Sequence, residues 1–231
     1  MYLILSKIGK ANHIDDMYEN EYLFFSNIKN FRSSKPDKAG RLDPKELNVN
    51  NQQINRLTLK TEEQEIHFHQ VFRDFKAQFH EHLVDPRTHC CSLHWLELEL
   101  DKDLSSYDDR LLELGEKTLL ILDWKRFFEI LDKAVSDKDL GVKRKKVTYY
   151  DPKELDGEIS LFHKQDSFQY QNEYRILVYH LATPSSKLKL SGLKEISAVI
   201  ETKHLKTLRI KKEKTEPNNT YTQCPAGRYY S

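Results

Sequence analysis

Gln171, Glu173 and Arg175 occupy alternate positions immediately before the apolar run 176–179. In a β-strand, residues two apart point to the same face, so these three side chains would stand in one row. An amide, a carboxylate and a guanidinium placed together predict a small polar site at the start of a strand. The alternative is an ion pair between Glu173 and Arg175 on a half-exposed strand, which would contribute little to stability.

The elements that position this site follow from the apolar spacing. Strands are predicted at 2–8, 22–26, 90–97, 118–122, 147–150, 187–190, 196–200 and 205–210, and helices at 13–20, 62–83, 105–114 and 124–135. The clearest helix is 62–83, where large apolar residues recur at spacings of three and four. Asp123 is a suitable N-cap for the last helix. Residues 33–53 are polar and predict a long loop.

Strands and helices alternate without a regular strand–helix–strand repeat, which favours an α+β fold with mixed, largely antiparallel sheets and helical insertions. The chain has 231 residues, 38% of them hydrophobic and 32% charged, which is a polar but globular composition. We expect a single domain over 1–212 and a polar, flexible tail over 213–231.

Composition also limits location and partners. The three cysteines, two of them adjacent, form no obvious disulfide framework and fit a reducing cytosol. No apolar stretch is long enough to span a bilayer, and the N-terminus lacks the layout of a signal peptide. We therefore expect a cytoplasmic protein that makes no membrane contact. The formal net charge of +1 argues neither for nor against nucleic acid.

Phe168, Gln171 and Glu173 form an F-x-x-Q-x-E motif ahead of a strand, which resembles the C-terminal signature of mono-ADP-ribosyltransferases. The resemblance implies an ADP-ribosyltransferase-like fold and cleavage of the nicotinamide–ribose bond of NAD, which would be a substrate. That reaction passes through an oxocarbenium ion, which a nearby carboxylate stabilises. The resemblance therefore implies that Glu173 is the catalytic carboxylate and that Gln171 faces the acceptor.

A longer series of landmarks, from about residue 22 to residue 200, resembles a family of bacterial and phage proteins often described as abortive-infection-related. The landmarks include YLFFSNIKNFR at 22–32, HCCSLHWL at 89–96, LGEKTLLILDWKRFFEIL at 114–131, VTYYD at 147–151 and LSGLKEISAVI at 190–200. The family's pattern around the motif appears here as Lys164, Phe168, Gln171, Glu173, Tyr174 and Arg175. This second resemblance covers the whole fold.

ADP-ribosyltransferases, including DarT-like toxins, begin with a strand whose Arg or His lines the nicotinamide pocket. The first strand here has neither, and the candidates for that basic group are Lys7, His13, Arg32 and Arg41. The resemblance implies that Arg32 or Arg41 binds the NAD pyrophosphate as a bidentate fork. It also implies that Tyr22 and Ser26 of the second strand lie at the NAD.

Two other groups of residues could be considered as a metal site and as a nucleic-acid site. The histidines at 67 and 69, 80 and 82, and 89 and 94 lack the spacing of a zinc site, so no metal is expected. The basic run 143–146, followed by Tyr149 and Tyr150, would suit the phosphates and bases of a nucleic acid. Its alternative is a solvated entry to a strand.

The leading hypothesis is an NAD-dependent ADP-ribosyltransferase-like toxin or effector of bacterial and phage conflict. It would modify nucleic acid or a host protein, and an antitoxin protein would be its partner. The alternative is a catalytically inactive binding module that recognises a protein or nucleic acid in phage defence or counter-defence. A cleft in which Glu173 faces an Arg from the first third of the chain favours the enzyme. Enclosure of Glu173 by Arg175 or Lys164, without an adjoining pocket, favours the module.

Overall fold

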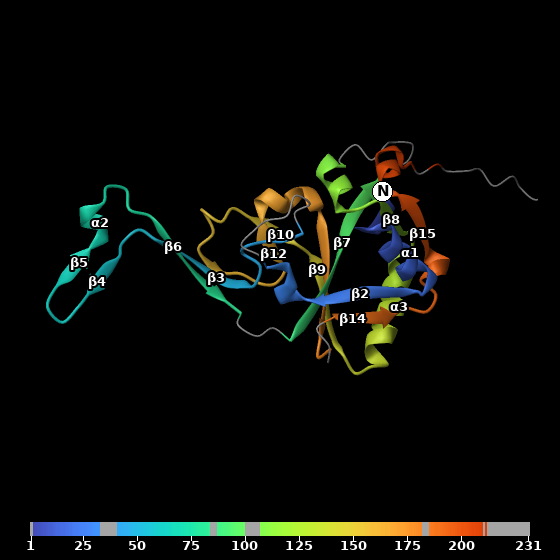
Figure 1. Cartoon of the computed structure of the whole chain (residues 1–231), viewed down its shortest axis with the longest axis horizontal. Coiled ribbons are helices and arrows are strands. Elements are labelled where there is room, and N and C mark those ends of the chain that lie inside the picture. The colour runs from blue at the N-terminus through green and yellow to red at the C-terminus, as the bar shows by residue number, and fades with distance from the viewer. Residues whose placement is uncertain are drawn as a thin grey trace, which may run out of the picture.

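The computed structural model describes residues 2–32, 41–83, 87–99, 107–181, 185–209 and 211, and its centre is an eight-stranded sheet (Figure 1). The strands of this sheet are β1 (Tyr2–Gly9), β2 (Tyr22–Asn27), β7 (Thr88–Leu98), β8 (Lys117–Ile121), β9 (Gly141–Lys146), β13 (Glu173–Tyr179), β14 (Ser185–Lys189) and β15 (Ser197–Glu201). Their pairings are antiparallel. The protein is therefore mixed α+β with mostly antiparallel strands, which confirms that part of the predicted fold class.

Helices and smaller sheets surround this sheet. The α-helices are α1 (Ala11–Glu19), α2 (Phe68–Val71) and α3 (Trp124–Ser136), and the 3-10 helices are η1 (Ile28–Phe31), η2 (Asp109–Leu114), η3 (Asp166–Gln171), η4 (Lys194–Ile196) and η5 (Thr202–Thr207). There are three small sheets among the described residues. In the first, β10 (Thr148–Tyr150) pairs with β12 (His163–Gln165), and in the second, β3 (Asn48–Ile54) lies between β11 (Gly157–Glu158) and β6 (Ala77–His82). In the third, β4 (Thr58–Lys60) pairs with β5 (Glu65–His67). Among the described residues, no helix has the length and apolar character needed to cross a membrane.

The long strand β7 organises the central sheet because it pairs with three others. One edge of β7 pairs with β13, which places Glu173 opposite His94. The other edge is shared, since β1 pairs with residues 94–98 and β2 pairs with His89 and Cys90. Residues 91–93 of β7 lie between these two pairings and have no partner strand on this edge among the described residues. The sheet therefore has an opening between β1 and β2.

The two longer helices cover one face of the central sheet. Their buried side chains share a core with β1, β2, β7, β8 and β13; this core includes Ile14, Met17, Leu23, Leu93, Leu119, Phe127, Leu131 and Ile176. Helix α3 begins where the sequence predicts it, because the Asp123 carboxylate accepts a hydrogen bond from the backbone N–H of Arg126 at 3.0 Å. On β13, Glu173 and Arg175 alternate with the core residues Tyr174 and Ile176, so their side chains point to the opposite face.

The predicted helix over 62–83 is wrong. The chain there forms β5, the four-residue helix α2 and strand β6. Strand β6 pairs with β3, so tertiary pairing satisfies the backbone groups that a helix would have satisfied internally. Phe72 and Phe79, which belong to the supposed apolar stripe, are 55% and 62% exposed. An amphipathic helix gains stability from burying its stripe, and here no core faces it.

Three other predictions need correction. The predicted loop over 33–53 contains part of strand β3, and its residues 33–40 lie outside the described chain. The last predicted strand, 205–210, is instead the 3-10 helix η5 as far as residue 207, because Leu205 turns into the core and is fully buried. The basic run 143–146 is not the entry to a strand but part of strand β9 itself. The predicted tail, 213–231, lies outside the described residues.

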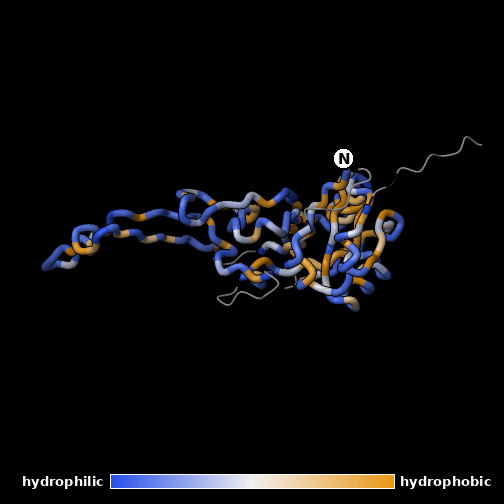
Figure 2. Tube along the Cα trace, turned by 90° about the horizontal axis from the view of Figure 1, so that it is seen from above, coloured by the Kyte–Doolittle hydropathy of each residue, from blue (hydrophilic) through white to orange (hydrophobic). Residues whose placement is uncertain are grey.

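Residues 48–82 form an arm that projects from the body of the protein (Figure 1). Strands β3 and β6 make its long stem, and β4, β5 and α2 make its tip. The view from above shows the same projection, with a largely hydrophilic chain interrupted by short hydrophobic stretches (Figure 2). The arm therefore stands away from the core of the central sheet.

Candidate functional site

The predicted motif folds as the end of a 3-10 helix followed by a strand. Gln171 is the last residue of η3, and β13 begins at Glu173. Asn172 between them has a φ of 40°, in the left-handed region that Asn tolerates better than most residues. The prediction that Gln171 stands in the strand is therefore wrong, because the turn at Asn172 interrupts the alternation. Both side chains nevertheless meet at Lys164, whose Nζ lies 2.8 Å from Gln171 Oε1 and 3.2 Å from Glu173 Oε2.

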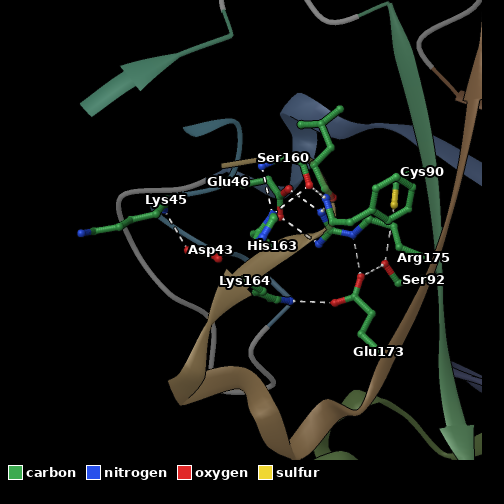
Figure 3. Close-up of polar contacts among 12 residues, drawn as sticks. Asp43, Lys45, Glu46, Cys90, Ser92, Ser160, His163, Lys164, Glu173 and Arg175 are labelled. Atoms are coloured by element: carbon green, nitrogen blue, oxygen red, sulfur yellow. Dashed lines mark hydrogen bonds and ion pairs between the residues drawn. The ribbon is translucent and has the colours of Figure 1, made fainter. Parts of the chain in front are cut away.

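Glu46, Lys164, Glu173 and Arg175 form a continuous network of ion pairs, which we call the charged cluster (Figure 3). Arg175 binds Glu46 with two nitrogens, Nη1 to Oε1 at 2.8 Å and Nη2 to Oε2 at 3.2 Å. Its Nε donates to Glu173 Oε1 at 2.9 Å, and Ser92 Oγ donates to the same oxygen at 2.6 Å. Lys164 completes the network on the other oxygen of Glu173.

No side chain of the charged cluster is more than 5% exposed. Removing a charge from water costs several kcal/mol, and good geometry with an opposite charge is needed to offset that cost. The cluster contains two carboxyl groups and two cations that bind one another, so its members depend on one another. Burial raises the pKa of Glu46 more than Arg175 and Lys164 lower it. The cluster joins β12, β13 and the turn before β3, and it therefore also fixes the relative positions of these segments.

Glu173 is ionised at neutral pH. Burial raises the pKa of its carboxyl, but the charges of Arg175 and Lys164 and the hydrogen bond from Ser92 outweigh burial and hold the pKa well below its usual range. Oε1 accepts from Arg175 and Ser92, whereas Oε2 accepts only from Lys164 among the described residues. A carboxylate oxygen has two acceptor positions, so Oε2 keeps one for a ligand.

We expect Glu173 to make stability depend on pH in the acid range. Its pKa in the folded protein lies below the ordinary value of 4.5, so between these two values the unfolded chain binds more protons. The stability from Glu173 is therefore present above about pH 4.5 and is lost as the pH falls further. Urea unfolding at several pH values from 3 to 6 measures the free energy of unfolding of the wild type and of Glu173→Gln. Below about pH 4.5, this free energy should fall less steeply with pH in the variant. The same pH dependence in both proteins would contradict the prediction.

A cavity of about 110 Å³ adjoins the charged cluster at the opening between β1 and β2. It is lined by Lys7, Ile8, Phe31, Arg41, Glu46, Cys90, Ser92, His94, Leu114, Lys164, Gln171, Glu173 and Arg175. Four of these side chains are Lys or Arg and two are Glu. His94 stays neutral because burial lowers its pKa to about 4. The cavity therefore has an excess of positive charge and suits an anionic ligand.

Two of the cavity's cations come from the first third of the chain. Lys7 on β1 reaches the gap in the sheet, where its Nζ donates to the Ser92 carbonyl oxygen at 2.8 Å. Within the described parts of the chain, no carboxylate lies within 4.0 Å of Lys7 Nζ. Arg41 donates from Nη2 to the carbonyl oxygen of Leu114. Lys7 and Arg41 thus add positive charge to the cavity beyond that of the charged cluster.

The structure brings together Gln171, Glu173 and Arg41, but the other predicted NAD-binding residues do not line this cavity. Arg32 lies near the arm, with Nη2 3.0 Å from His82 Nε2. The hydroxyl of Tyr22 donates to Asp16 at 2.6 Å, and Ser26 Oγ accepts from Asn30 at 2.9 Å. Of the basic candidates for the first strand, Lys7 and Arg41 are the ones that line the cavity, whereas His13 and Arg32 do not.

Sequence reasoning named Arg175 and Lys164 as partners of Glu173 but missed two further residues of the network, Glu46 and Ser92. Glu46 lies 129 positions from Arg175, and Ser92 lies 81 positions from Glu173, so no local spacing relates them. One signal was available, because Arg175 stands in an otherwise apolar strand and a buried guanidinium requires a carboxylate. That signal predicts that a partner exists but does not say that Glu46 is the partner.

Cys90 and Cys91 are free and buried. Burial raises the pKa of the Cys90 thiol to about 12 and also raises that of Cys91. Since the thiolate is the reactive form, we expect iodoacetamide at neutral pH to leave both thiols unmodified in the native protein and to alkylate both in denaturant. Peptide mass mapping measures this, and fast alkylation of Cys90 in the folded protein would contradict its burial.

Comparisons with protein families, curated proteins and solved structures find no match to this chain. Among the described residues, no three His, Cys, Asp or Glu side chains are placed so as to hold a metal ion. The side chains that line the cavity indicate its chemistry. They are a fixed carboxylate, an amide and an excess of cations.

Proposed function

We propose that this protein is an NAD-dependent ADP-ribosyltransferase-like enzyme with the corresponding fold, in which Glu173 is the catalytic carboxylate. The observation that carries the proposal is that ionised Glu173 lines the same cavity as Lys7 and Arg41. The F-x-x-Q-x-E motif that ends at Glu173 supports the same chemistry. A negative charge already fixed in place stabilises an oxocarbenium ion without reorganisation during the reaction.

The cavity supports the binding of one end of NAD. Ordinary ligand pockets measure about 300–1,000 Å³, whereas this one has about 110 Å³, so only part of NAD would enter and the rest would lie outside. The remaining acceptor position on Glu173 Oε2 suits a ribose hydroxyl. The cations Lys7 and Arg41 suit the negative pyrophosphate, with Arg41 able to offer a bidentate fork.

The proposed acceptor is nucleic acid or a host protein, in the setting of bacterial and phage conflict, with an antitoxin as a protein partner. Strand β9 lies at the edge of the central sheet, beside β13, and supports the nucleic-acid version. Arg144 and Lys146 on β9 pair with Asp132 and Glu97. Lys143 and Lys145 have no carboxylate within 4.0 Å among the described residues, so their charges are available to phosphates.

The role proposed for Gln171 predicts a separation of two activities. We expect Gln171→Ala to reduce transfer of ADP-ribose to the acceptor about tenfold or more, while release of nicotinamide changes less, because Gln171 faces the acceptor and Glu173 acts on NAD. Parallel assays of nicotinamide release and acceptor labelling measure the ratio. Gln169→Ala, a neighbouring amide outside the cavity, is the control. Equal losses of both activities in Gln171→Ala would contradict the acceptor-side role.

One observation favours the alternative of a catalytically inactive binding module. Arg175 and Lys164 both bind Glu173, so most of its charge is balanced within the protein. In that case the cavity would bind an anionic group of a partner protein or nucleic acid without any reaction. Incubation with labelled NAD and either cell extract or RNA separates the two functions. The enzyme releases nicotinamide or labels an acceptor, and it does so far less as Glu173→Gln, whereas the module does neither.

A further inference from the structure

The arm has an apolar surface that the protein itself does not cover. Leu59, Ile66, Val71, Phe72 and Phe79, which we call the apolar patch, are each between 40% and 64% exposed. Side chains of this size gathered on one projection are typical of a surface that binds another macromolecule. The patch lies on the arm, away from the cavity, whose lining includes no residue of the arm.

The tip also has too little core to be stable by itself. Strands β4 and β5 have three residues each, and α2 has four. No side chain between residues 55 and 76 is buried. An isolated two-stranded hairpin is only marginally stable in water, and three or more strands or a packed helix are needed for independent stability. A partner that covers the apolar patch would supply the missing burial.

The charges of the arm select the kind of partner. Residues 55–76 contain four Lys or Arg and four Asp or Glu. Nucleic-acid binding requires an excess of positive charge, which this segment lacks. The two signs are nevertheless unevenly spread along the arm, because Glu62, Glu63 and Glu65 outnumber Lys60 at its end and Arg56, Arg73 and Lys76 outnumber Asp74 nearer the stem. Lys60 pairs with Glu65, whereas the side chains of Glu62, Glu63, Arg56, Arg73 and Lys76 are exposed and, within the described residues, have no opposite charge within 4.0 Å.

We propose that the arm binds the arm of a second copy of this chain, antiparallel to it, about a two-fold axis. In such an isologous contact, the acidic turn of each arm meets the basic region of the other, and both apolar patches are covered between these ends. Arg56 and Glu62 are six residues apart, or about 20 Å of extended strand, so both charged ends can pair at once. Since the arm projects from the body in both views, the two bodies would lie at opposite ends of the dimer (Figures 1 and 2).

A charge exchange tests this arrangement on the full-length protein. We expect sedimentation velocity to show a dimer of the wild type that dissociates on dilution. Reversal of the acidic turn, Glu62→Lys with Glu63→Lys, and reversal of the basic region, Arg56→Glu with Arg73→Glu, should each weaken the dimer about tenfold or more. An equimolar mixture of the two variants should form a heterodimer, because in that pair both charged contacts are again complementary.

The apolar patch is tested separately. Val71→Ser with Phe72→Ser should leave the protein monomeric yet folded, whereas Leu122→Ser, a 52% exposed side chain on the body, should leave the dimer intact. A wild type that stays monomeric up to about 100 μM would overturn the proposal. A dimer that survives all the arm variants, or two charge-reversed variants that do not associate when mixed, would overturn it equally.

Discussion

Replacement of Arg175 by Met is expected to lower the free energy of unfolding by about 3–5 kcal/mol. Arg175 is 2% exposed and binds both carboxylates of the charged cluster. Without it, Glu46 keeps no ion-pair partner among the described residues, and Glu173 keeps only Lys164. Methionine fills similar space but cannot compensate either charge. Urea unfolding at pH 7 measures the change.

The control for this prediction is Arg126→Met. Arg126 also forms an ion pair, with Glu129 at 2.8 Å, but its side chain is 58% exposed. Exposed pairs contribute about 0–1 kcal/mol, so this variant should remain close to wild type. In the double variant Glu46→Gln with Arg175→Met, the buried carboxylate is removed together with its partner. We expect an interaction energy of about 1–3 kcal/mol between the two sites, and additive losses would show that they are not coupled.

Replacement of Glu173 by Gln is expected to lower the rate of nicotinamide release from NAD by about 10²–10³-fold. The amide keeps the size of the side chain but removes the negative charge that would stabilise the oxocarbenium ion. If chemistry limits turnover, the loss should fall mainly on kcat, because the charge acts on the transition state more than on bound NAD. Initial rates at several NAD concentrations separate kcat from KM.

Glu173→Gln also unbalances the charged cluster, so folding must be checked beside activity. Circular dichroism and the melting temperature show whether the variant is folded at the assay temperature. Glu154→Gln, an exposed carboxylate on the body, is the matched control and should keep full activity. Folded Glu173→Gln with wild-type kcat would contradict the catalytic role.

Local signals predicted the elements that pack against a core. Helix α3 has a good N-cap and an apolar stripe whose residues Phe127, Leu131 and Val135 are buried, so its pattern and its environment agree. A similar stripe at 62–83 led to the wrong prediction of a helix, because Phe72 and Phe79 are exposed to water and β6 pairs with β3. Periodicity reports what a segment could bury, whereas the pairing of distant strands decides what it does bury.

The candidate site was predicted in part for a similar reason. The polar motif was visible because Glu173 and Arg175 are adjacent on one face of β13. The backbone of Asn172 is in the left-handed region, and the turn it makes takes Gln171 out of the strand. The alternating pattern of the sequence does not indicate this turn. Glu46 and Ser92 reach the site only through the fold, so spacing could not identify them. Lys7 was one of several basic candidates, and the opening between β1 and β2 singles it out.

Titration calorimetry of the purified protein with NAD tests the central claim most directly. The account predicts saturable binding with a Kd between about 1 μM and 1 mM, and binding about tenfold weaker in Lys7→Gln, which removes a cation of the cavity that has no carboxylate partner among the described residues. Lys125→Gln, an exposed lysine on α3, should bind NAD as the wild type does. No binding heat from folded wild type at millimolar NAD, or equal affinity in Lys7→Gln, would contradict a site for NAD in this cavity.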